Sequence, residues 1–258
     1  MPAERKSIGL AALKAVSAAV GVVLQMGIAA VFGAGREVDA LLIGVFIAIG
    51  LPRELARVIS TSLVPCLVEE QEHSGNAGLA PTFMLACLGT AFTLTVAMIA
   101  GTPLILKVIC PGFDPETRLL AEQLLRYMAP SLFFFMLFGA AQGFFHARHR
   151  FFAPEAAVIL WKALALATLA TLGVRHGAWA YALGLTAATA AQWLLMAAVS
   201  RAGAEPVEIL PLRLEQFRPA ALKPFGALAG VLLIALLLRK VEEVVDRITV
   251  SYMASGAV

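Results

Sequence analysis

Three charged residues and a proline interrupt the middle of a long apolar stretch. The stretch runs from Val38 to Leu67, which is long enough to cross a bilayer, and it contains Pro52, Arg53, Glu54 and Arg57. A charge at the centre of a membrane costs about 3 kcal/mol on insertion scales. Arg53 and Arg57 are four positions apart and share one helix face, and Pro52 can bend the helix at that level. These groups must therefore face other helices or a water-filled cavity.

The composition of the whole chain agrees with insertion into a membrane. Of its 258 residues, 60% are hydrophobic and 14% are charged, whereas soluble domains have about 45–50% apolar and about 25% charged residues. The sequence therefore predicts an all-α integral membrane protein. The net charge of +3 is typical of basic loops rather than of a nucleic-acid partner. Cys66, Cys87 and Cys110 lack metal-ligand spacing, so we expect no metal and no cofactor.

Apolar runs divide the chain into about seven transmembrane helices. We expect residues 1–200 to form a first lobe of six helices. Residues 201–224, which contain four prolines, are expected to form a cytoplasmic linker, and residues 225–258 the first helix of a second lobe. This last run is purely apolar at its start and charged on one face further on, which predicts a helix that lines something polar.

The segment before the fourth span and a pair of glycines within that span each allow a local prediction. The segment from Asp114 to Arg126 begins with an Asp N-cap followed by proline, is amphipathic, and is expected to lie at the outer surface before the chain re-enters the membrane. Gly139 and Gly143 have the spacing that suits close packing of two helices.

Basic residues are distributed unequally between the two sides of the predicted topology. Eight lie on the expected inner side and four on the outer side, which predicts a cytoplasmic N-terminus. The inner set is Arg5, Lys6, Arg148, Arg150, Arg201, Arg213, Arg218 and Lys223, and the outer set is Arg36, Lys107, Arg118 and Arg175.

Lysines also occur inside the first and fifth spans. Lys14 and Gln25 are eleven positions apart, or three helical turns, and fall near one stripe. That stripe lines a cavity, or else Lys14 extends to the headgroups and Gln25 bonds a neighbouring helix. Lys162 lies near the middle of the fifth span.

Several stretches, in order along the chain, resemble motifs of the MurJ/MviN family of lipid II flippases. They are Phe32–Ala40, Pro111–Asp114, Leu124–Pro130, Gly143–Pro154 and Val245–Gly256. The resemblance implies membership of the multidrug/oligosaccharidyl-lipid/polysaccharide exporter superfamily. Such proteins have two six-helix lobes around a central cavity and move lipid-linked glycans across the bacterial inner membrane by alternating access. This chain matches the first lobe and the opening helix of the second.

The resemblance and the chemistry of arginine together select the candidate site residues. The fork of a guanidinium suits phosphate oxygens, so a lipid-linked glycan pyrophosphate is the expected partner, with membrane lipids around it. Expected substrate-binding residues are Arg53, Arg57, Arg247, Lys14 and Lys162; expected gate or ion-coupling residues are Asp39, Asp246 and Glu54, with Asp246 as a ligand for a coupling cation. The family's arginines in the first helix match Ala18 and Leu24 here.

Other interpretations remain open at this point. Arg53–Glu54 and Asp246–Arg247 could be internal ion pairs that only hold helices together. The chain could act as a non-transporting scaffold or a truncated remnant in cell-envelope glycan synthesis, or as one half of a homodimer or of a complex with a partner carrying the missing lobe. An enzyme is not favoured, because the sequence contains no nucleophile elbow and no paired acids typical of a glycosidase.

Overall fold

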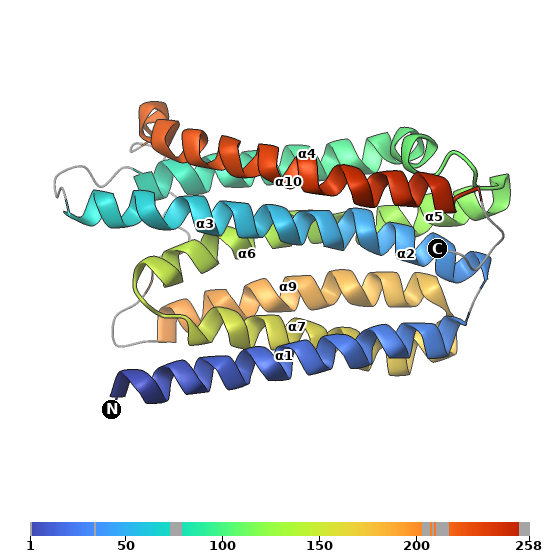
Figure 1. Ribbon diagram of the computed structural model, residues 1–258, viewed down its shortest axis with the longest axis horizontal. Coiled ribbons are helices and arrows are strands. Elements are labelled where there is room, and N and C mark those ends of the chain that lie inside the picture. Colours follow the sequence, from blue (N-terminus) through green and yellow to red (C-terminus); the bar gives the residue numbers. More distant parts are fainter. Residues whose placement is uncertain are drawn as a thin grey trace.

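The computed structural model describes residues 2–33, 35–72, 79–202, 207, 209 and 217–252. These residues form an all-helical bundle. Its helices run side by side along the long axis (Figure 1). In order they are α1 (Pro2–Phe32), α2 (Arg36–Val45), the π-helical turn η1 (Phe46–Gly50), α3 (Leu51–Glu72), α4 (Leu79–Ile109), α5 (Pro115–Met128), α6 (Pro130–Ala147), α7 (Phe152–Thr168), the π-helical turn η2 (Leu169–Gly173), α8 (Val174–His176), α9 (Ala178–Ala202), the 3-10 turn η4 (Pro219–Leu222) and α10 (Lys223–Val250).

Six helical segments of the described chain are long and apolar enough to cross a membrane. They are Ser7–Phe32, Leu79–Ile109, Pro115–Ala147, Phe152–His176, Ala178–Ala202 and Pro219–Val250. A seventh rod, α2–η1–α3, lies alongside them (Figure 1) but carries the charges of Arg53, Glu54 and Arg57. The predicted fold class, all-α with about seven membrane helices, is confirmed. The chain is a multi-pass membrane protein.

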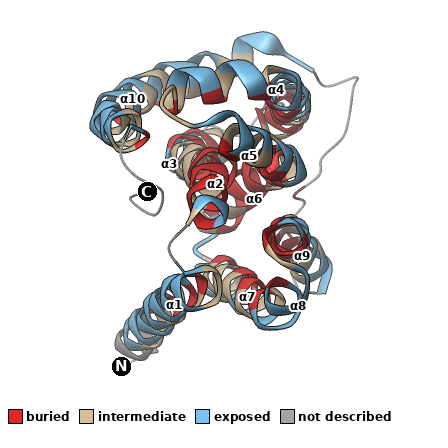
Figure 2. Ribbon diagram, turned by 90° about the vertical axis from the view of Figure 1, so that its right-hand side faces the viewer, coloured by how far each residue is buried: buried red, intermediate tan, exposed pale blue. Residues whose placement is uncertain are grey.

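Viewed end-on, the helices form two groups. Helices α1, α7 and α9 lie together on one side, while α2, α3, α5 and α6 form a centre flanked by α4 and α10 (Figure 2). Burial is densest on α2 and α6, whose side chains contribute much of the hydrophobic core. The buried helix α6 packs against α3, and α2 leads into α3 through η1, so the core adjoins the helix that carries the central charges.

Two glycines bring α6 into direct backbone contact with α3. A Cβ added at Gly139 would lie 2.5 Å from the carbonyl oxygen of Ala56, and one added at Gly143 would lie 2.9 Å from the Leu63 side chain. Any larger residue would push the helices apart, since packed interiors leave no space for extra atoms. The predicted close packing is therefore confirmed, and it fixes the face that α3 turns away from α6.

The helix that carries the charges is not a regular α-helix. The π-helical turn η1 ends two residues before Pro52. Proline has no N–H and its ring clashes with the preceding turn, so a wider turn at this point relieves both problems. The bend expected from Pro52 thus takes the form of a π-helical turn.

The start of α5 was predicted correctly, but its position was not. Asp114 caps the helix: the Thr117 hydroxyl and amide donate to its carboxylate at 2.6 and 3.2 Å, and these bonds hold the pKa of Asp114 below its ordinary value. The helix does not lie on the outer surface. Its apolar stripe, which includes Leu124 and Met128, is buried against α2, α9 and α4, and α6 continues directly from it after Ala129. The apolar side chains of α5 therefore pack against other helices of the protein and not against the membrane interface.

We predict that Gly139→Leu will destabilise the bundle, because the side chain would overlap the Ala56 backbone. Overpacking of this kind costs about 1–3 kcal/mol. Unfolding of the purified protein in detergent, followed by tryptophan fluorescence, measures the free energy of unfolding. Gly89→Leu on α4 is the matched control, because nothing lies within 4 Å of a Cβ at that position. Equal stability of the two variants would contradict the glycine contact.

Candidate functional site

A polar cavity of about 580 Å³ opens where α1, α2, η1, α3, α7, α9 and α10 meet. Its wall combines apolar residues, mostly from α1, α2 and η1, with charged residues from α3, α7 and α10. The charged lining consists of Arg53, Lys162, Lys240 and Arg247 with Glu54 and Glu243. Cations outnumber acids four to two, so the cavity favours an anion.

A second cavity, of about 390 Å³, adjoins the first. It is lined by Lys14, Arg53, Ala56, Arg57, Phe135, Phe138, Gln142, Glu155, Val158, Trp161, Lys162 and Gln192. Arg53, Trp161 and Lys162 line both cavities, so these side chains form the boundary between them. We call the two the large cavity and the small cavity below.

Arg53 lies at this boundary without an acidic partner. Within the part of the chain that the structure describes, no carboxylate lies within ion-pairing distance of its guanidinium. The side chain is exposed to both cavities. An unpaired guanidinium at membrane depth requires water or an anion beside it.

Arg57, by contrast, is paired. Its guanidinium donates to Glu54 at 2.8 Å, and Arg239 of α10 donates to the same carboxylate oxygen at 2.8 Å. The Glu54 side chain is only 13% exposed. Glu54 therefore ties α3 to α10. The alternative prediction that Glu54 pairs with Arg53 is wrong, because its carboxylate pairs with Arg57 and Arg239 instead. Adjacent residues on a helix point in different directions.

Two lysines connect α7 with α1. Lys162 donates to the backbone oxygen of Ser17 at 2.6 Å and to its hydroxyl at 2.9 Å. Lys14 lies 3.9 Å from Glu155. Lys162 thus has two roles: it holds the two helices together and presents its charge to both cavities.

Helix α10 contributes the remaining cations of the large cavity. The Arg247 guanidinium lies 5.5 Å from the centre of the Phe46 ring and the Lys240 ammonium 5.8 Å from it, which is the distance of a cation–π contact. Lys240 also bonds Glu243 on its own helix. The end of α10 is fixed by Ser251, whose hydroxyl accepts from the Gly112 amide at 3.2 Å.

The structure brings together the five residues expected to bind substrate, whereas two of the expected acids lie elsewhere. Arg53, Lys162 and Arg247 line the large cavity, and Lys14 and Arg57 line the small one. Glu54 lines the large cavity. Asp39 is buried near the start of α2 and Asp246 is exposed on α10. Neither lines these two cavities, and their gate and ion-coupling roles stay predictions.

The polar stripe of α1 faces the cavities. Gln25 lines the large cavity and Lys14 the small one, so the cavity interpretation of the stripe is the one that the structure supports. Ala18 and Leu24 of the same helix also line the large cavity.

Sequence reasoning missed several lining residues. They are Lys240 and Glu243 on α10, Glu155 and Trp161 on α7, Gln142 on α6 and Gln192 on α9. The two glutamines carried a usable signal, because an amide inside a membrane span must face protein or water. Trp161 carried no such signal, since an apolar helix has many reasons to contain an aromatic residue.

Comparison with known proteins identifies the family of this chain. The family model described as lipid II flippase MurJ matches residues 28–258. The chain belongs to this family. The curated protein named "Probable lipid II flippase MurJ" from Synechocystis sp. is 26% identical over 151 residues, which cover 56% of this chain and 28% of the Synechocystis protein.

The fold is also found among solved transporters. A structure of lipid II flippase MurJ in an inward closed conformation matches 96% of this chain with a TM-score of 0.77 and 19% identity. A MOP superfamily transporter from Pyrococcus furiosus matches 89% with a TM-score of 0.70 and 17% identity. The chain covers 52% of each of these two structures. It therefore spans about half the length of these relatives, and the MurJ-like fold of this half is shown.

We predict that Glu54→Gln will weaken the connection between α3 and α10, because the amide is a poorer acceptor for the two guanidinium groups. The arginines are largely solvent-exposed, so the expected loss is about 1 kcal/mol. Unfolding in detergent at low and high salt measures it, and the loss should shrink as salt rises. Glu242→Gln, at an exposed position of α10, is the control. A Glu54 variant as stable as this control at low salt would disprove the bridge.

Proposed function

We propose that this protein is a flippase, or the first half of one, for a lipid-linked glycan, and that it binds the pyrophosphate of its substrate at the boundary of the two cavities. The observation that carries the proposal is Arg53, an exposed guanidinium at membrane depth without an acidic partner in the described chain. Lys162 lines the same boundary. Membership of the MurJ family supports the choice of a lipid-linked substrate.

The mechanism follows from the cost of moving an anion through lipid. A pyrophosphate that enters a low-dielectric medium loses its hydration. The free energy of this desolvation is far larger than the stabilisation from a single contact with the protein. A hydrated cavity with fixed cations replaces part of that hydration, and the arginine fork binds phosphate oxygens in a defined geometry. Alternating exposure of such a cavity to the two sides of the membrane would carry the headgroup across while the lipid tail stays in the bilayer.

The membrane topology in this proposal places the N-terminus in the cytoplasm of a bacterial cell. The turn Arg148–Phe151, the end of α9 and the start of α10 lie at the end of the bundle where α1 begins (Figure 1). Most basic loop residues of the expected inner set belong to that end, and such residues are retained on the cytoplasmic side. Residues 1–200 are then the first lobe, and residues 225–258 open the second.

A further helical bundle is part of this proposal. The most apolar windows of α1 and of Pro219–Val250 are each only 11% buried, although α1 and α10 both line the large cavity. We expect a second lobe, in the same protein, in a partner or in a second copy of this chain, to cover the open side of the cavity. A coupling cation at Asp246 would belong to that complete assembly.

The alternative function is a scaffold that does not transport. It is favoured by the ion pairs Arg57–Glu54 and Arg239–Glu54, which hold helices together. In a scaffold, however, a guanidinium at Arg53 without an acidic partner would destabilise the protein and would bind no substrate. Replacement of Arg53 therefore distinguishes the two functions.

We predict that Arg53→Ala will reduce headgroup transport at least about tenfold, because one charge-assisted contact to phosphate contributes about 1.5–3 kcal/mol. Arg57→Ala should have a smaller effect, since Arg57 is already paired. Translocation of a fluorescent isoprenyl diphosphate in proteoliposomes measures this. Arg175→Ala, at the exposed α8 end of the bundle, is the control. Unchanged transport in both Arg53 and Arg57 variants would remove the binding role and favour the scaffold.

A further inference from the structure

Two buried polar side chains point to a ligand in the small cavity that is not a phosphate. The indole N–H of Trp161 and the amide oxygen of Gln192 are buried and have no hydrogen-bond partner among the described residues. The two residues are 6% and 2% exposed, and both line the small cavity. A buried polar group without a partner costs about 1–3 kcal/mol. A site that tolerates two such groups is built for a molecule, or for water, that satisfies them.

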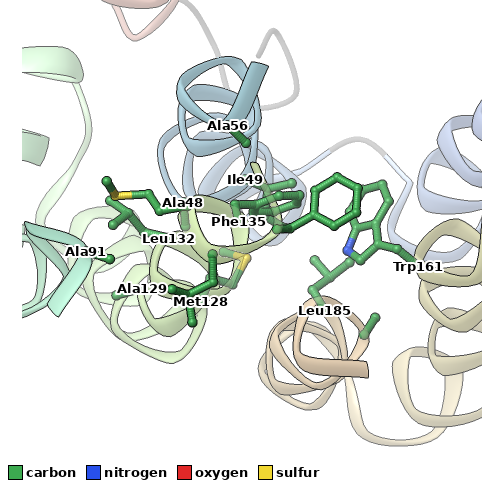
Figure 3. Packing of buried hydrophobic residues seen from close by; sticks show 14 of the residues in the cluster. Ala48, Ile49, Ala56, Ala91, Met128, Ala129, Leu132, Phe135, Trp161 and Leu185 are labelled. Carbon is green, nitrogen blue, oxygen red and sulfur yellow. The ribbon is translucent and has the colours of Figure 1, made fainter. Parts of the chain in front are cut away.

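These groups converge from different helices. Trp161 extends from α7, with its ring edge-on to Phe135 of α6 at 5.9 Å between centroids (Figure 3). Gln142 comes from α6 and Gln192 from α9, while Glu155 of α7 adds a carboxylate. The small cavity thus offers an N–H donor, two amides and an acid acceptor beside aromatic surface. A ligand with several hydroxyl groups on an apolar ring has the matching chemistry.

The position of the small cavity relative to the cations fixes what this ligand is attached to. Arg53 and Lys162 line both cavities, so a diphosphate at that boundary has one cavity on each side. The large cavity also has the cations of α10, whereas the small cavity has the amides and the indole. In a lipid diphosphate sugar, the lipid tail stays in the bilayer and the sugar is bonded directly to the distal phosphate, so the sugar lies next to the boundary. Of the two cavities that meet there, the small cavity has the neutral hydrogen-bonding groups that match sugar hydroxyls.

We infer that the small cavity is the subsite for the first sugar of the lipid-linked glycan, with Trp161 and Gln192 as the residues that select a sugar-bearing substrate. The inference rests on the proposed function and assigns the substrate class within it. A volume of about 390 Å³ lies at the low end of small-molecule sites, which are about 300–1,000 Å³. It suits one neutral monosaccharide rather than a chain of several.

Binding of two matched lipids to the full chain in nanodiscs tests the inference. The probes are farnesyl diphosphate and the same lipid with one hexose on its distal phosphate. The wild type should bind the hexose-bearing lipid at least about fivefold more tightly, the effect of one or two hydrogen bonds. In Trp161→Phe and in Gln192→Leu this ratio should fall to about one, because hydrogen-bonding sites discriminate against partners that leave them unpaired. Affinity for farnesyl diphosphate should change less than about twofold in Gln192→Leu, because Gln192 lines the small cavity and not the boundary.

Control variants separate the subsite from general effects. Trp193→Phe removes another unpartnered buried indole N–H, but Trp193 lines neither cavity, and Gln25→Leu changes an amide of the large cavity. Both should keep the wild-type ratio. If Trp161→Phe does not fold, Gln192→Leu decides alone.

The outcomes distinguish this inference from the proposed function. If neither lipid binds the wild type, the proposed function fails and the inference fails with it. If both lipids bind equally, or if the Trp161 and Gln192 variants weaken both lipids alike, the diphosphate site stands and the sugar subsite is wrong. A loss of the ratio in the controls as well would also overturn the subsite.

Discussion

A guanidinium inside the thickness of a membrane needs an acid, water or an anion beside it, and this requirement organises the whole bundle. Arg53, Arg57 and Glu54 occupy one short segment of α3, and the structure satisfies them in different ways. Glu54 accepts from Arg57 and from Arg239 of α10, whereas Arg53 extends between two polar cavities. The paired charges fasten α3 to α10, and Arg53, which has no acidic partner among the described residues, remains available to a ligand.

The precision of that arrangement depends on the opposite face of α3. Gly139 and Gly143 let the α6 backbone touch Ala56 and Leu63, so α3 cannot rotate without a steric clash. The π-helical turn η1 then sets the direction in which the chain enters α3. Because both constraints come from backbone shape, they do not depend on solvent or salt. A rigid apolar contact on one face thus holds the charges on the other face in place.

Much of the fold could be predicted from the sequence, because a bilayer allows few solutions. Backbone groups in lipid must be satisfied within helices, so apolar runs of the right length predicted the class and the order of the spans. Helical spacing also placed Lys14 and Gln25 near one stripe of α1, although it did not show whether that stripe faces a cavity. The depth of α5 could not be predicted in the same way, since an amphipathic stripe such as Leu124 and Met128 suits a membrane interface and a protein neighbour equally well.

The site was harder to predict, because its composition depends on how helices are rotated against one another. The charged residues of α10 follow one another so closely that the sequence does not say which of them face α3. Lys240 and Glu243 line the cavity, while Asp246 remains exposed. Likewise, nothing local shows that Glu54 pairs with Arg57 and Arg239 rather than with the adjacent Arg53. Contacts between helices that are 185 residues apart in sequence are tertiary properties and have no local pattern.

The positive charge beside α1 in the large cavity comes from a neighbouring helix. Ala18 and Leu24 stand where the resemblance places arginines, and both line the large cavity, so α1 itself supplies no cation at those positions. Lys162 of α7 brings its ammonium to the same wall: it bonds Ser17, next to Ala18, and lies 3.3 Å from the Cβ position of Gly21. Glycine at position 21 leaves the space that the lysine occupies. The charge on this part of the cavity wall is thus supplied by α7 and held in place by α1.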